Sequence, residues 1–147
     1  METDQVRAIA VRLRHAMKAA HDGGDLACFA TETFPDGYCG VAADFLCQYL
    51  CDERLGDAWQ RVSGEVPQRD AEPGPRPTHA CAEWEDVIVD ITAGQFPGRP
   101  AVFVGSQDAW YCGITRTGSG AGGIAGYMNA DAVRKAYEAV WRRASAD

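Results

Sequence analysis

The sequence contains no apolar run of about 18 residues, the length that a helix needs to cross a bilayer. We therefore expect no transmembrane segment. The first residues, Met1 to Asp4, are acidic, whereas a secretory signal peptide would begin with basic and then apolar residues. The sequence therefore predicts a cytoplasmic protein, in which the six cysteines are reduced and do not form a disulfide framework.

Clustered basic residues are also lacking. The chain has 14 lysines and arginines and a net charge of −7, whereas nucleic-acid and anionic membrane surfaces are bound by clustered cations. The denser basic groups fall on expected helices and are typical of solvated helix faces: Arg7, Arg12, Arg14, Arg142 and Arg143. We therefore expect neither a nucleic-acid partner nor a membrane partner.

Motifs for a cofactor are missing as well. The glycine-rich segment 117–126 has neither the Gly-Lys-Ser/Thr ending of a phosphate loop nor the spacing of a dinucleotide fingerprint. No Cys-x-x-Cys pair is present, so Cys47, Cys51, Cys81 and Cys112 are interpreted as small core side chains. We expect no cofactor and no metal. A structural zinc site that uses the Cys47 and Cys51 pair is the alternative.

Helical and strand-like segments follow one another in blocks. At 147 residues the chain has the size of one domain, 1–147. Apolar residues recur at helical spacing in three segments: 3–21, 39–54 and a last helix capped by Asn129 or Asp131. Strand-like segments lie between the last two helices: 59–66, 79–84, 87–92, 101–104 and 109–114. This order predicts an α+β fold with an antiparallel sheet.

Two segments lack the pattern of a helix or a strand. Residues 67–78 hold four prolines and a glycine, which predicts a surface loop. Residues 113–126 hold six glycines and are expected to form a flexible loop near the functional site.

One cysteine stands at the expected start of the second helix. Asp36-Gly37 is a turn sequence, and the helical spacing of apolar residues begins at Ala42, which places Cys39 on the first turn. The unpaired N–H groups and the dipole of a helix N-terminus lower the pKa of a thiol. The same N–H groups can bind an oxyanion. Cys39 is therefore a candidate nucleophile.

A histidine and an aspartate are expected to meet on a hairpin further along the chain. If Glu85-Asp86 is a two-residue turn, Trp84 pairs with Val87, and His79 and Asp90 then project to the same face with Cys81. A carboxylate next to a histidine fixes its tautomer and stabilises the imidazolium. A histidine next to a thiol generates a thiolate. Cys39, His79 and Asp90 thus have the residue types of a nucleophile, a base and an orienting acid.

A purely structural role for these residues is the competing interpretation. Cys39 would then be a small apolar filler, His79 a surface residue at the edge of a loop and Asp90 a charge at a strand end. However, Asp90 lies within the apolar strand Val87-Ile88-Val89-Asp90-Ile91, where an unpaired acid is costly. We therefore favour the triad.

The order and spacing of these motifs resemble those of a known family. Gly37-Tyr38-Cys39-Gly40 at a helix start, Thr78-His79-Ala80-Cys81-Ala82-Glu83-Trp84, and the segment 87–96 from Val87 to Phe96 are similar to the transglutaminase-like branch of the papain-fold superfamily. The similarity covers about residues 34–104. It implies a papain-like fold, with N-terminal helices packed on the antiparallel sheet and a C-terminal helix, and it implies Cys39 as nucleophile, His79 as base and Asp90 as orienting acid.

The resemblance implies a thiol-dependent amide hydrolase or acyl transferase that acts on a peptide or protein substrate. Peptidase, glutamine deamidase and transamidase chemistry all remain open. Two departures stand out: Cys81 occupies a position where the family often has tryptophan, and the oxyanion glutamine that papain-type enzymes carry before the nucleophile is missing, with Thr33 in that region. A non-catalytic binding module on the same fold is therefore the alternative.

Overall fold

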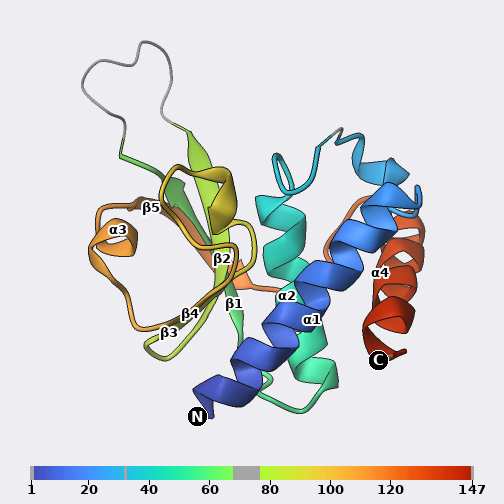
Figure 1. Ribbon diagram of the computed structural model, residues 1–147, viewed down its shortest axis with the longest axis horizontal. Coiled ribbons are helices and arrows are strands. Elements are labelled where there is room, and N and C mark those ends of the chain that lie inside the picture. The colour runs from blue at the N-terminus through green and yellow to red at the C-terminus, as the bar shows by residue number, and fades with distance from the viewer. Residues whose placement is uncertain (1, 32, 68–76, 147) are drawn as a thin grey trace.

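A five-stranded antiparallel sheet forms one side of the molecule (Figure 1). The computed structural model describes residues 2–31, 33–67 and 77–146. The sheet has the order β4-β3-β2-β1-β5 and consists of β1 (Gln60–Glu65), β2 (Thr78–Trp84), β3 (Val87–Asp90), β4 (Phe103–Gly105) and β5 (Thr115–Ala121). The helices are α1 (Thr3–Asp22), α2 (Cys39–Asp52), α3 (Ala109–Cys112) and α4 (Ala130–Ser145), with single 3₁₀ turns η1 (Ala27–Phe29) and η2 (Ala93–Gln95). This is the α+β class that the sequence predicted.

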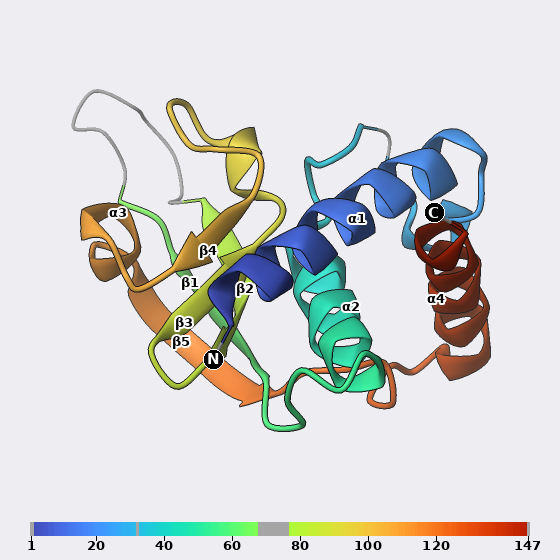
Figure 2. The same ribbon diagram turned by 60° about the horizontal axis from the view of Figure 1, so that its bottom comes forward.

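The helices form two layers on one face of the sheet. Helix α2 packs on β1 and β2, and α1 packs on α2, β3 and β4. Helix α4 packs on α1 and lies farthest from the sheet (Figures 1 and 2). The core between these layers is closed by fully buried apolar side chains: Leu13, Met17, Phe45, Leu46, Leu50 and Val89. None of the helices in the described part of the chain has both the length and the hydropathy needed to span a bilayer.

The β2–β3 hairpin has the predicted register. Trp84 pairs with Val87, and Ala82 pairs with Val89. Glu85, the first residue of the turn, has a φ of 55°. Positive φ of this kind is what a two-residue hairpin turn requires. The register fixes which side chains share a face, and it is the reason that the sequence alone could relate His79 to Asp90.

The predicted strand 109–114 is wrong, because residues 109–112 form the single helical turn α3. The side chain of Asp108 accepts a hydrogen bond from the Tyr111 N–H at 3.0 Å and so caps this turn. Tyr111 then packs with Cys81 and Ile88. These two strand residues alternate with Ala82 and Val89, which contact the helical layer, so α3 covers the opposite face of the sheet.

The predicted loop 113–126 is also wrong, because residues 115–121 form the edge strand β5. This strand pairs with β1, and all seven of its residues are exposed. Backbone pairing with β1 therefore forms the strand without a buried side-chain face. The other predicted loop, 67–78, lies mostly outside the described residues.

Candidate active site

Cys39 is the first residue of α2. Helix α2 and strand β2 begin in the upper half of Figure 1 and run side by side. The Cys39 thiol interacts with the backbone of Ala80, near the start of β2. The N–H of Ala42 donates to the Tyr38 carbonyl at 2.7 Å, so the N–H groups of residues 39–41 precede the first bond of the helical ladder. Tyr38 does not cap them, because its hydroxyl lies 2.8 Å from Nδ1 of His21. Backbone donors are therefore present beside the thiol.

His79 and Asp90 form a buried pair. Nε2 of His79 lies 2.6 Å from Oδ2 of Asp90, and both side chains are 1% exposed. The hydroxyl of Tyr111 donates to the same Oδ2 at 2.7 Å, and the N–H of Thr92 donates to Oδ1 at 2.9 Å. Both carboxylate oxygens of Asp90 thus have hydrogen-bond partners, which a buried acid in an apolar strand needs.

The imidazole of His79 also interacts with Cys39. Burial raises the pKa of the Cys39 thiol, but hydrogen bonding and charge from His79, with backbone groups at Ala80 and Gly40, outweigh it and leave the pKa lowered. Burial lowers the pKa of His79, whereas Asp90 and Cys39 raise it to about 9. These directions favour a thiolate paired with an imidazolium. Because Asp90 occupies Nε2, the nitrogen that serves the thiol is Nδ1.

Aromatic rings enclose the imidazole. Phe96 and Trp110 meet the His79 ring edge-on, with centroid distances of 5.0 and 5.7 Å. Together with the burial of Asp90, these contacts keep solvent away from the ion pair, which strengthens its electrostatic interaction. Cys39 is more exposed than its partners. The thiol is therefore the accessible member of the three, while His79 and Asp90 stay buried.

Gln95 is a site residue that sequence reasoning missed. Its Nε2 lies 3.3 Å from Nδ1 of His79, the nitrogen that faces the thiol. A side-chain oxyanion donor was expected before Cys39, whereas Gln95 lies five positions after Asp90, on η2. The signal was present in the sequence, because the motif Asp90-Ile91-Thr92-Ala93-Gly94-Gln95 carries an amide on the turn that follows the aspartate.

The other cysteines differ from Cys39 in environment, and all six are free. Cys47 and Cys81 are buried, as expected for core side chains; burial raises the pKa of Cys47 to about 12 and also raises that of Cys81. The same expectation is wrong for Cys51 and Cys112, which are exposed. Within the described residues, no group of three histidine, cysteine or acidic side chains is arranged to hold a metal.

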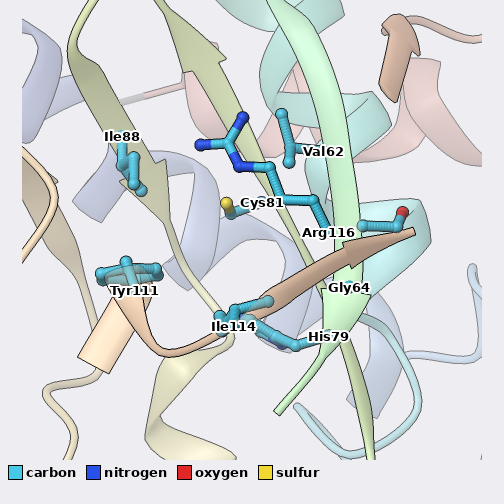
Figure 3. Close-up of a pocket in the computed structure, with 9 residues that line it drawn as sticks. Val62, Gly64, His79, Cys81, Ile88, Tyr111, Ile114 and Arg116 are labelled. Atoms are coloured by element: carbon cyan, nitrogen blue, oxygen red, sulfur yellow. The ribbon is translucent and has the colours of Figure 1, made fainter. Parts of the chain in front are cut away.

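A small cavity lies behind the site (Figure 3). It is lined by His79, Cys81, Tyr111 and neighbouring residues of β1 and β5, and its volume is about 20 Å³. That volume accommodates about one water molecule. The cavity is therefore a gap in the packing beneath α3 and is too small for a peptide substrate.

Comparison with models of protein families, with curated proteins and with solved structures gives no match for this chain. The interpretation of the site therefore depends on its own geometry.

Proposed function

We propose that the chain is a cysteine hydrolase or acyl transferase that acts on an amide carbonyl, with a papain-like fold of the transglutaminase-like type. The observation that carries the proposal is the continuous connection from Cys39 through His79 to Asp90, with the pKa of the thiol lowered and that of the imidazole raised to about 9. Groups whose pKa is shifted by burial together with a specific charged partner are concentrated at functional sites.

In the first half of the reaction the Cys39 thiolate attacks the amide carbon. A C–S bond forms, and the carbonyl π electrons move to oxygen. Backbone N–H groups at the start of α2 stabilise the oxyanion, and the amide of Gln95 is placed to assist. The His79 imidazolium then gives its proton to the leaving nitrogen, the C–N bond breaks, and an acyl-enzyme remains.

In the second half an acceptor releases the acyl group. His79, now neutral, takes a proton from the acceptor as it attacks the thioester, and the Cys39 thiolate leaves. Water as acceptor gives peptidase or glutamine deamidase chemistry, and an amine gives transamidation. Asp90 keeps the imidazole oriented and stabilises its charge in both halves.

A peptide or protein substrate suits the edge of the sheet. Strand β5 pairs with β1 on one side and is the outermost strand of the described sheet. Its Gly118 and Gly120 have open space where a side chain would be. An exposed edge of this kind can pair with an extended peptide through backbone hydrogen bonds.

Alkylation with iodoacetamide at pH 6 tests the proposal. We expect Cys39 to react much faster than the exposed thiols Cys28, Cys51 and Cys112, because the interaction of Cys39 with His79 lowers the pKa of its thiol and so increases its thiolate fraction. His79→Gln should remove this difference. Equal and slow labelling of all cysteines would exclude the enzyme and favour a non-catalytic binding module.

A peptide screen by mass spectrometry then identifies the reaction. Wild type and Cys39→Ala are incubated with the same peptide mixture, with and without an added amine. New fragments indicate a peptidase, a gain of one mass unit per glutamine indicates a deamidase, and an adduct of the amine indicates a transamidase.

A further inference from the structure

Arg61 projects from β1 toward the start of α2. It pairs with Ala82 on one neighbouring strand and with Gly120 on the other, so it occupies the same face of the sheet as the helical layer. A Cβ on Gly40, the residue that follows Cys39, would lie 2.6 Å from Nη2 of Arg61 and 3.0 Å from its Cζ. The guanidinium therefore lies directly over the backbone next to the nucleophile.

Asp44 holds this guanidinium in place. Its Oδ2 lies 2.7 Å from Nη1 of Arg61 and accepts a hydrogen bond from the Tyr127 hydroxyl at 2.5 Å. The N–H of Gly123 donates to Oδ1 at 3.4 Å. The Asp44 side chain is only 6% exposed, whereas that of Arg61 is 40% exposed. The aspartate is thus a buried support, and the arginine presents its charge to solvent.

The exposed part of Arg61 lines two adjoining hollows in the surface. One, of about 230 Å³, is completed by Ser63 and residues 118–121, and the other, of about 320 Å³, by Asp44, Tyr127 and residues of the 121–126 segment. Arg61 is the cationic residue of both linings. Burial lowers the pKa of Arg61, but Asp44, together with Tyr127 and Cys39, outweighs this effect and leaves the pKa raised, so the guanidinium stays charged.

We propose that Arg61 is a specificity-determining residue that binds a carboxylate of the substrate beside the scissile carbonyl. This inference rests on the proposed function, because it concerns a substrate of Cys39. A fixed, partly desolvated guanidinium is suited to carboxylates, which it binds through charge-assisted hydrogen bonds. The carboxylate can belong to an acidic side chain or to the C-terminus of a peptide, and the chemistry of recognition is the same.

Two alkylating agents of similar size test this proposal without knowledge of the substrate. The Cys39 thiolate displaces iodide from either iodoacetate or iodoacetamide; an S–C bond forms and a C–I bond breaks. The measured quantity is the ratio of the iodoacetate rate to the iodoacetamide rate at Cys39, divided by the same ratio at the exposed cysteines. We expect a value on the order of ten, since a hydrogen bond to a charged group contributes about that factor or more.

Matched variants assign the preference to Arg61. Arg61→Gln should bring the normalised ratio close to one, and Arg61→Lys should retain part of it. Arg61→Gln leaves the buried carboxylate of Asp44 without its cationic partner. The double variant Asp44→Asn with Arg61→Gln therefore provides a second measurement, in which no buried charge is left unpaired. Arg134→Gln, an exposed arginine on α4, should leave the ratio unchanged.

Three small competitors distinguish the two sources of the carboxylate. Acetyl-glutamate α-amide has only a side-chain carboxylate, acetyl-glutamine only a terminal one, and acetyl-glutamine α-amide has neither. Protection of Cys39 from iodoacetamide by the first assigns an acidic side chain, and protection by the second assigns a C-terminus. Equal effects of all three would overturn the proposal.

The outcomes separate this inference from the function on which it rests. Slow reaction of Cys39 with both reagents would overturn the hydrolase itself. Fast reaction with iodoacetamide, together with a normalised ratio near one in the wild type, would overturn only the role of Arg61.

Discussion

His79 Nε2 lies 2.6 Å from Asp90 Oδ2 across a hairpin, although 11 positions separate the two residues in the chain. Burial lowers the pKa of His79, and this carboxylate, with Cys39, raises it to about 9. The charged state of the site at neutral pH therefore depends on Asp90.

Asp90→Asn should reduce the reactivity of the site. The variant keeps the shape of the side chain but removes its charge, so the pKa of His79 falls below about 9 and the thiolate–imidazolium pair weakens. We expect iodoacetamide labelling of Cys39 at pH 6 to slow about tenfold or more. Hydrolysis should fall by a factor on the order of 10² to 10⁴.

The pH profile of each protein measures this effect. Wild-type hydrolysis should fall as pH rises through about 9, where the imidazolium loses its proton, and in Asp90→Asn this limb should move to lower pH. Asp86→Asn, in the exposed turn of the same hairpin, is the matched control and should behave as wild type. An unchanged limb in Asp90→Asn would contradict the assigned pairing.

Gln95→Ala should affect hydrolysis but not alkylation. Hydrolysis passes through an oxyanion that the Gln95 amide can stabilise, whereas displacement of iodide by the thiolate forms no oxyanion. We expect hydrolysis to fall about 10²-fold and the rate of labelling by iodoacetamide to change less than about twofold. If both rates fall together, Gln95 instead positions His79, whose Nδ1 lies 3.3 Å from the amide nitrogen.

The raised pKa of His79 also links stability to pH. In the folded chain the pKa is about 9, above the unfolded value of about 6.5. The corresponding contribution to the free energy of unfolding is fully present below about pH 6.5 and is lost as pH rises through about 9. Urea unfolding of wild type and His79→Gln should differ by about 1 to 3 kcal/mol more at pH 6 than at pH 10. A constant difference across this range would contradict the linkage.

The pairing of His79 with Asp90 was predictable because it follows from the number of residues that separate each of them from the hairpin turn. A two-residue turn fixes the hairpin register, and the register fixes the shared face. Helices α1, α2 and α4 followed from apolar spacing for a similar reason: the pattern of burial repeats within one element.

The errors occurred where contacts between distant segments decide the structure. Trp110 and Tyr111 have the side chains of a strand, yet Asp108 caps a helical turn there, and the turn brings Tyr111 to Asp90 and Trp110 to His79. In β5 the glycines argue against a strand, but the edge of β1 supplies the backbone partners. Gln95 and Arg61 were not among the predicted residues, and the side chains that they contact, His79 and Asp44, lie 16 and 17 positions away in the chain.

Gly120 and Gly122 lie two positions apart, and alanine substitutions at them test how closely the chain packs against Cys47. A Cβ on Gly122 would overlap Sγ of the buried Cys47 and lie 2.6 Å from its Cβ, whereas a Cβ on Gly120 would have nothing within 4 Å. Neither glycine has a positive φ, so alanine is strained at neither position by its backbone conformation. Gly122→Ala should therefore lower the free energy of unfolding by about 1 to 3 kcal/mol through overpacking.

Gly120→Ala is the matched control. It should leave the free energy of unfolding unchanged or raise it by a few tenths of a kcal/mol, because alanine reduces the entropy of the unfolded chain. Urea unfolding of the two variants measures both effects, and equal stability of the two would contradict the close contact between Gly122 and Cys47.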